Sequence, residues 1–199
     1  MHDAEARFKK VLSKHPLHPG ALNLLAVALT QLGRFEEAER IVKLALKESA
    51  GSDATFYNYG IILKSLRRPE EALEQFSRAL QINPNVADTW NNRGTVFNDL
   101  ARYPEAVADF DKALALSPNH AGAHYNKGKS LAQLRLYEPA LEAYGRALAL
   151  NPALAEAWLG RGNVFLETRR YDEALAACDK AAALDPNLKF ALGARLQAK

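Results

Sequence analysis

The chain has 199 residues and a formal net charge of +3, from 26 basic and 23 acidic residues. No run of like charge is longer than a pair, which gives no indication of a nucleic-acid-binding surface. No apolar stretch approaches the roughly 20 residues of a membrane span, and the first residues do not resemble a secretory signal. Because a single cysteine cannot form an internal disulfide, we expect a cytoplasmic protein without nucleic-acid or membrane partners.

One residue pattern recurs every 34 positions through most of the chain. A fixed period of this length predicts stacked copies of one supersecondary unit, each too small to bury its own apolar face. Only Ala50 interrupts the proline series. The recurring residues are Pro16, Pro84, Pro118, Pro152 and Pro186, then Ala38, Ala72, Ala106, Ala140 and Ala174, then Gly60, Gly94, Gly128 and Gly162.

Each copy predicts two amphipathic helices. In the copy at 87–120, Trp90, Gly94 and Phe97 are spaced four and three residues apart, and Ala106 and Phe110 begin a second stripe of the same kind. Proline or an acidic residue opens the second half of each copy, as suits the first turn of a helix. The closing proline prevents that helix from continuing.

In chain order, we expect residues 1–18 to form the second helix of a partial repeat and residues 189–199 to begin a further helix. Five full repeats lie between them, at 19–52, 53–86, 87–120, 121–154 and 155–188. The whole chain is then one all-α solenoid, in which added length extends the surface and not the depth of the core. Because the sequence starts and stops within repeats, we expect it to be an excerpt from a longer protein.

These positions resemble the tetratricopeptide repeat family, whose signature is an aromatic residue or leucine, a small residue, an aromatic, an alanine, an aromatic and a closing proline. The fifth copy carries it at Trp158, Gly162, Phe165, Ala174 and Pro186. The resemblance implies a right-handed α-solenoid of helix-turn-helix repeats. It also implies a scaffold that binds another protein, so we expect this chain not to be an enzyme.

No group of residues predicts catalysis, a cofactor or a bound metal. Cys178 occupies the position of Phe76, Phe110 and Tyr144 in three sister copies, which predicts a place in the core. His15 and His18 lack the cysteine or acidic partners of a metal site. The run Gly128-Lys129-Ser130 resembles the end of a phosphate-binding loop, but it lacks the earlier glycine and falls within a predicted helix.

The first helix of each repeat lines the inner surface in this architecture, and asparagine fills its sixth position in three successive copies. An amide side chain offers donors and an acceptor, so it can pair with the backbone of an extended ligand of any sequence. The alternative is that these residues are simply tolerated on a solvated face, although asparagine is a poor helix former. The candidate residues are Asn58, Asn92 and Asn126 at the sixth position, Tyr57, Asn91 and Tyr125 at the fifth, Thr95, Lys129 and Asn163 at the ninth, and Lys64 and Asn98 at the twelfth.

The run of asparagines also resembles the solenoid of O-linked N-acetylglucosamine transferases, including the SPINDLY-like bacterial members. Residues 185–199 are similar to the passage that leads from their repeats into the glycosyltransferase region. This resemblance implies the substrate-recruiting arm of a protein glycosyltransferase, with the catalytic region outside this sequence. The basic residues of carboxylate-binding solenoids are missing beside the asparagines. A further alternative is a self-assembly element that associates through its terminal repeats.

Overall fold

The computed structural model describes residues 2–48 and 51–188, and the helix expected within 189–199 lies outside this range. The described residues form eleven α-helices and no strand, which confirms the predicted all-α class. None of these helices has both the length and the apolar character needed to cross a bilayer. The helices are α1 (His2–Lys14), α2 (Pro19–Gln31), α3 (Phe35–Glu48), α4 (Asp53–Ser65), α5 (Pro69–Ile82), α6 (Ala87–Asp99), α7 (Tyr103–Leu116), α8 (Ala121–Gln133), α9 (Tyr137–Leu150), α10 (Ala155–Glu167) and α11 (Tyr171–Leu184).

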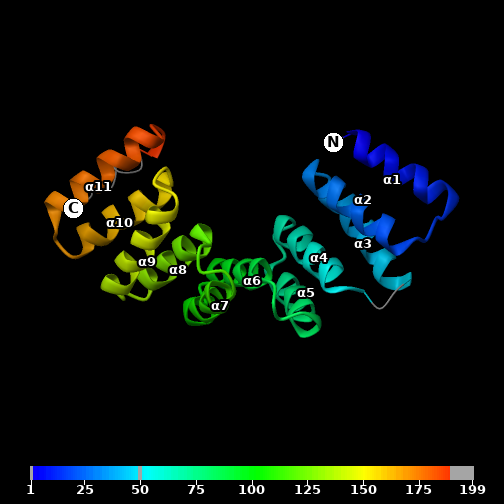
Figure 1. Ribbon diagram of the computed structural model, residues 1–199, viewed down its shortest axis with the longest axis horizontal. Helices are drawn as coiled ribbons and strands as arrows, with labels where there is room; N and C mark the ends of the chain where they lie inside the picture. Colours follow the sequence, from blue (N-terminus) through cyan, green and yellow to red (C-terminus); the bar gives the residue numbers. More distant parts are fainter. Residues whose placement is uncertain (1, 49–50, 189–199) are drawn as a thin grey trace. The chain divides into compact units, whose positions relative to one another are not determined.

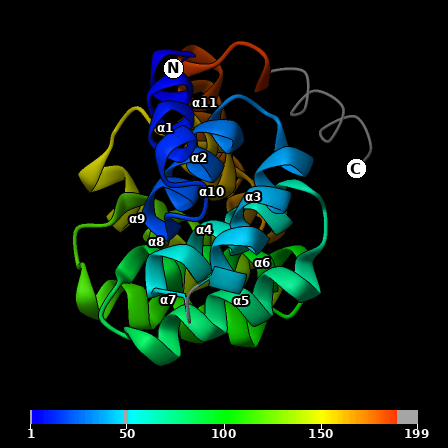
Figure 2. The ribbon, with the colours of Figure 1, turned by 90° about the vertical axis from the view of Figure 1, so that its right-hand side faces the viewer.

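Consecutive helices pack in pairs within two compact units that divide between residues 100 and 101, and we call them the N-terminal unit and the C-terminal unit. Figures 1 and 2 show such pairs at α2 with α3 in the first unit and at α10 with α11 in the second. The first helices of neighbouring repeats also contact one another, α2 with α4, α4 with α6, and α8 with α10. These first helices carry the candidate binding residues.

The recurring glycine lets the two helices of a pair approach closely. A Cβ on Gly60 would lie 2.7 Å from Cε1 of Phe76, and one on Gly128 would lie 2.8 Å from Cδ1 of Tyr144. Both aromatic rings are buried. The glycine register therefore exists because the partner helix places a large side chain against the backbone of the first helix.

Cys178 occupies the same place in the last pair, as predicted. It is buried, and its Sγ would lie 2.6 Å from a Cβ on Gly162. Burial, together with the charge of Asp179, raises the pKa of the Cys178 thiol. A thiol that is buried and protonated packs as a small apolar group and is a poor nucleophile.

His124, at the fourth position of its repeat, makes the contact that tryptophan makes at this position in the two neighbouring repeats. Nε1 of Trp90 donates a hydrogen bond to the carbonyl oxygen of Pro84 at 2.7 Å. Nε2 of His124 lies 2.9 Å from the carbonyl oxygen of Pro118, again six residues earlier. Histidine at this position thus keeps the hydrogen bond to the carbonyl six residues earlier.

The turn between the helices of each pair contains one residue in the left-handed backbone conformation. The sequence alone does not predict this, because most of these residues are not glycine. Gly33 has φ of 73°, and arginine or alanine takes this conformation in the later copies, for example Arg67 with φ of 57°. The N–H of Arg67 bonds to the carbonyl of Lys64 at 3.0 Å, and the N–H of Arg68 bonds to that of Leu63 at 2.9 Å. These two bonds define a Schellman motif, in which glycine is the preferred residue.

Replacing Arg67 with glycine is expected to raise the free energy of unfolding by about 1 kcal/mol, because an L-residue in the left-handed region is strained. Denaturant titration of the purified chain measures the change. Gly33→Ala is the converse control, since nothing lies within 4 Å of the added Cβ and only the backbone strain acts. If both substitutions leave the unfolding midpoint unchanged, the strain assigned to this turn is wrong.

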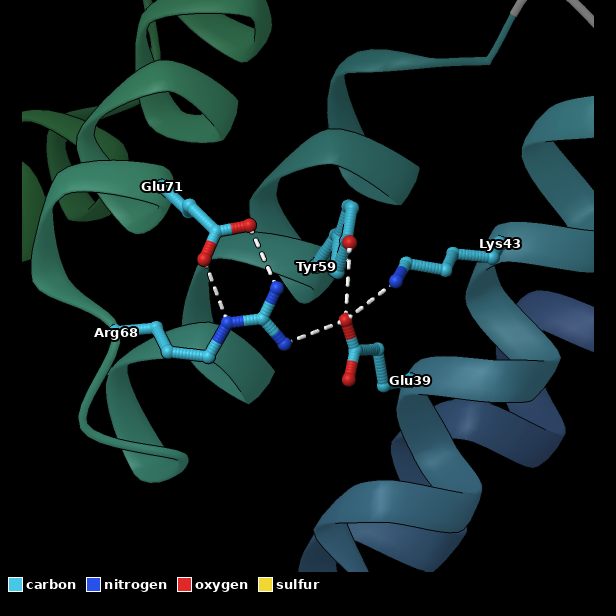
Figure 3. A network of polar contacts seen from close by, with 5 residues as sticks. All are labelled: Glu39, Lys43, Tyr59, Arg68 and Glu71. Carbon is cyan, nitrogen blue, oxygen red and sulfur yellow. Dashed lines mark hydrogen bonds and ion pairs between the residues drawn. The ribbon is translucent and has the colours of Figure 1, made fainter.

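A polar network joins α3, α4 and α5 in the N-terminal unit (Figure 3). Glu39 on α3 accepts hydrogen bonds from Lys43 at 2.7 Å, from Arg68 at 2.7 Å and from the hydroxyl of Tyr59 at 3.3 Å. Arg68 also pairs with Glu71 at 2.6 Å. The Glu39 side chain is only 14% exposed, so its carboxylate is better shielded from solvent than those of the ion pairs on the outer surface.

The network makes the stability of the fold depend on pH in the acidic range. Burial alone would raise the pKa of the Glu39 carboxyl, but hydrogen bonds from Lys43 and Arg68 outweigh it and lower the pKa below the ordinary value of 4.5. Because the folded carboxyl binds its proton less readily than the unfolded one, its contribution to stability is complete above pH 4.5 and disappears as the pH falls through the folded pKa.

Glu39→Gln is therefore expected to destabilise the chain at neutral pH and to lose that effect in acid. Urea unfolding of both proteins across the acidic range measures the difference in midpoint. Glu70→Gln removes an equal charge from the exposed start of α5 and serves as the control. A Glu39→Gln penalty that stays constant into strong acid would contradict the role given to this carboxylate.

Candidate functional site

In the N-terminal unit, the sixth-position asparagines bond to side chains of the preceding repeat. Nδ2 of Asn58 donates to Oδ1 of Asn23 at 3.1 Å. Nδ2 of Asn92 donates to the hydroxyl of Tyr57 at 3.0 Å and to the backbone carbonyl of Asp88 at 2.9 Å. The amide donors expected to face a ligand at these two positions are thus engaged within the chain.

A second hydrogen bond joins the same two helices, α4 and α6. Nζ of Lys64, at the twelfth position, donates to Oγ1 of Thr95, at the ninth position of the next repeat, over 2.8 Å. The Thr95 hydroxyl in turn donates to the carbonyl of Asn92 at 2.7 Å. Two side-chain hydrogen bonds, Tyr57 with Asn92 and Lys64 with Thr95, therefore link the surfaces of α4 and α6.

In the C-terminal unit, both of these inter-helix bonds are lost between α8 and α10. Gly160 stands at the position of Asn92 and has no amide to offer to Tyr125, and Ala132 stands at the position of Lys64 and cannot reach Asn163. A pocket of about 490 Å³ opens here between α8, α9 and α10. Residues that line it include Tyr125, Lys129, Tyr144, Glu156, Gly160 and Asn163.

Tyr144 explains why the sixth position is glycine in this repeat. A Cβ on Gly160 would lie 2.6 Å from Cζ of Tyr144 and 2.9 Å from its hydroxyl oxygen. In the N-terminal unit the equivalent ring is Phe76, which has no hydroxyl, and the residue at the sixth position of the next repeat is Asn92. The exchange of phenylalanine for tyrosine on α9 thus excludes a side chain from α10 and leaves the pocket.

One residue of the pocket lining has a buried polar atom without a hydrogen-bond partner among the described residues. Oδ1 of Asn163 is buried and has no hydrogen-bond partner among the described residues. Tyr125 contacts Tyr144 with ring centroids 6.1 Å apart, and it lacks the amide partner that Tyr57 has in Asn92. An unsatisfied buried acceptor costs about 1–3 kcal/mol.

The two tyrosine hydroxyls in the pocket are neutral hydrogen-bonding groups. Burial, with the nearby charge of Glu156, raises the pKa of Tyr125. Burial, with the influence of Tyr125, raises the pKa of Tyr144. Both hydroxyls therefore keep their protons at neutral pH and can each donate and accept.

The structure thus separates the candidate residues into groups. Five candidates form hydrogen bonds with other residues of the N-terminal unit: Tyr57, Asn58, Lys64, Asn92 and Thr95. Two more, Asn91 and Asn98, are half-buried on α6. Tyr125, Lys129 and Asn163 line the pocket in the C-terminal unit, and Asn126, half-buried on α8, lies outside it.

Sequence reasoning named Tyr125, Lys129 and Asn163 and missed the other residues of the pocket, among them Tyr144, Glu156 and Gly160. The available signal was the loss of asparagine at the sixth position of the fifth repeat, together with the loss of lysine at the twelfth position of the fourth. The repeats that lack these polar residues therefore indicated the pocket better than the repeats that have them.

Comparison with known proteins agrees with this architecture. Profiles described as tetratricopeptide repeat match residues 1–58, 54–86, 87–120 and 125–188. No curated protein matches the sequence.

Solved structures of similar fold include YrrB, described as a TPR protein with an unusual peptide-binding site. It is 23% identical, with a TM-score of 0.77 over 94% of this chain and 97% of its own. MamA from Desulfovibrio magneticus RS-1 is 21% identical, with a TM-score of 0.78 over 85% of this chain and 96% of its own. Pseudomonas aeruginosa pilF is 23% identical, with a TM-score of 0.75 over 83% of this chain and 75% of its own. At these identities the likeness shows a shared solenoid fold.

Proposed function

This chain belongs to the tetratricopeptide repeat family, whose members are protein-interaction scaffolds, and we propose that it binds an extended segment of another protein with the α8–α10 pocket as the main contact. One observation carries the proposal. The two side-chain hydrogen bonds that link α4 to α6 have no counterpart between α8 and α10, where a pocket lies instead.

The chemistry of the pocket suits a polypeptide backbone. An extended segment presents N–H donors and C=O acceptors at regular intervals, and the pocket offers Tyr125, Asn163 and Lys129 to meet them. Among its charged residues, Lys129 and Arg135 balance Glu156 and Glu167. A lining with no net formal charge favours a neutral ligand group over a charged one. The peptide-binding site named for the similar protein YrrB lends further support.

Selection from a displayed library of random peptides against the full chain tests this function. Ala132→Lys places a lysine where Lys64 stands in the second repeat, so its ammonium can bond to Asn163 and fill the pocket from within. Selected peptides are expected to lose about tenfold or more in affinity for this variant. Ala149→Lys, which adds the same charge on an exposed position of α9, should bind them as the parent chain does.

Two outcomes would contradict the proposed function. One is a selection that enriches no peptide above an unrelated helical protein. The other is a set of peptides that binds Ala132→Lys and the parent chain equally well.

The run of Asn58, Asn92 and Asn126 supports a second candidate, the substrate-recruiting arm of a protein glycosyltransferase. In that case the bound segment is a substrate, and the sugar-transferring domain is encoded beyond Lys199. Reading the gene past this point tests it, and a continuation without a nucleotide-sugar-binding domain would end this candidate.

A further inference from the structure

The pocket between α8 and α10 presents donors and acceptors in a combination that matches one kind of side chain. We infer that it accepts the primary carboxamide of a glutamine or asparagine from the bound polypeptide. This inference rests on the proposed function and names the side chain that the same site selects.

The N-terminal unit shows what occupies the equivalent place when the chain fills it. There the carboxamide of Asn92 donates to the hydroxyl of Tyr57 and to the backbone carbonyl of Asp88. In the C-terminal unit, Tyr125 and Glu156 stand at the positions of Tyr57 and Asp88. Gly160 stands at the position of Asn92 and has no side-chain carboxamide. An incoming carboxamide can therefore donate to Tyr125 and to the carbonyl of Glu156 as Asn92 does to their counterparts.

The other polar groups of the pocket also suit a carboxamide. The oxygen of such a ligand can accept a hydrogen bond from Lys129 or from Nδ2 of Asn163, both of which belong to residues in the lining. Turning the Asn163 carboxamide about its last bond exchanges its buried oxygen for its nitrogen. A ligand amide complements either arrangement, because it carries both a donor and an acceptor.

Charged side chains fit this set of groups less well. An ammonium group only donates, and it would approach the like charges of Lys129 and Arg135. A carboxylate only accepts, and it would approach Glu156 and Glu167. Because the lining is balanced in charge, neither ion gains a net attraction to offset the cost of leaving water.

A series of four peptides tests the inference by NMR titration of the full ¹⁵N-labelled chain. Each is an acetylated pentapeptide with a methylamide end, alanine at four positions, and glutamine, glutamate, lysine or methionine at the centre. We expect the glutamine peptide to bind about fivefold to tenfold more tightly than the methionine peptide. It should also shift the side-chain amide signals of Asn163.

Two variants separate hydrogen bonding from packing. Tyr125→Phe keeps the ring against Tyr144 and removes the hydroxyl, so it should reduce the preference for glutamine and leave the methionine peptide unaffected. Lys129→Met should weaken the glutamine peptide and strengthen the lysine peptide. Melting curves that match the parent chain show that either variant is folded.

The possible failures are distinct. Tightest binding by lysine or glutamate would overturn the inference, as would no shift with any peptide at millimolar concentration. Equal binding of all four peptides, lost in Ala132→Lys, would also overturn it, yet it would leave the proposed function standing on backbone recognition. Failure of the library selection counts against the proposed function itself.

Discussion

Replacing Phe76 with alanine is expected to lower the free energy of unfolding by about 3–5 kcal/mol, because it leaves a cavity in the core of the N-terminal unit. The Phe76 side chain is fully buried, and its ring lies 5.9 Å from that of Tyr57. It also fills the space over Gly60.

Chemical denaturation followed by circular dichroism measures the effect. Ile82→Ala, on the same helix but 53% exposed, removes an apolar side chain that contributes little to the core and should change the midpoint only slightly. Equal midpoint shifts for the two variants would contradict the position of Phe76 at the centre of the packing.

Gly128→Ala is expected to destabilise the C-terminal unit by about 1–3 kcal/mol through overpacking. The new Cβ would lie 2.8 Å from both Cδ1 and Cε1 of Tyr144, a ring that is only 3% exposed and has little room to move. Adding one methyl group to a helix therefore costs stability here, although alanine is the better helix former.

Gly145→Ala, on the adjacent helix α9, provides a matched control. Nothing lies within 4 Å of the Cβ that this substitution adds, so only helix propensity acts and stability should rise by about 1 kcal/mol. Thermal unfolding of the two variants should thus shift in opposite directions. Shifts of the same sign would show that the contact with Tyr144 does not govern the choice of glycine at position 128.

The helical pairing was predictable from the sequence because it depends on spacing alone. Apolar residues at intervals of three and four define the buried stripe of each helix, and the glycine register marks where two backbones meet. The core position of Cys178 followed from the same periodicity, since its counterparts are aromatic residues such as Phe76. These features repeat because the two helices of every pair pack against each other in the same way.

The candidate site was less predictable because periodicity identifies which face a residue occupies and not what its polar group bonds to. Asn92 lies at the expected position on α6, yet Tyr57 and Asp88 already accept its amide hydrogens. The bond to Tyr57 joins two repeats across 35 residues of sequence and depends on two side chains matching in length and chemistry. The left-handed conformation of Arg67 escaped sequence reasoning for a related reason, since the turn tolerates strain in a residue other than glycine.

Hydrogen–deuterium exchange with and without a selected peptide tests most directly whether this protein binds through the surface where its own inter-helix bonds are missing. We expect the peptide to slow exchange in α8 and α10 and to leave α4 and α6, which Tyr57–Asn92 and Lys64–Thr95 join, unchanged. Slower exchange in α4 and α6, with none in α8 and α10, would contradict the account.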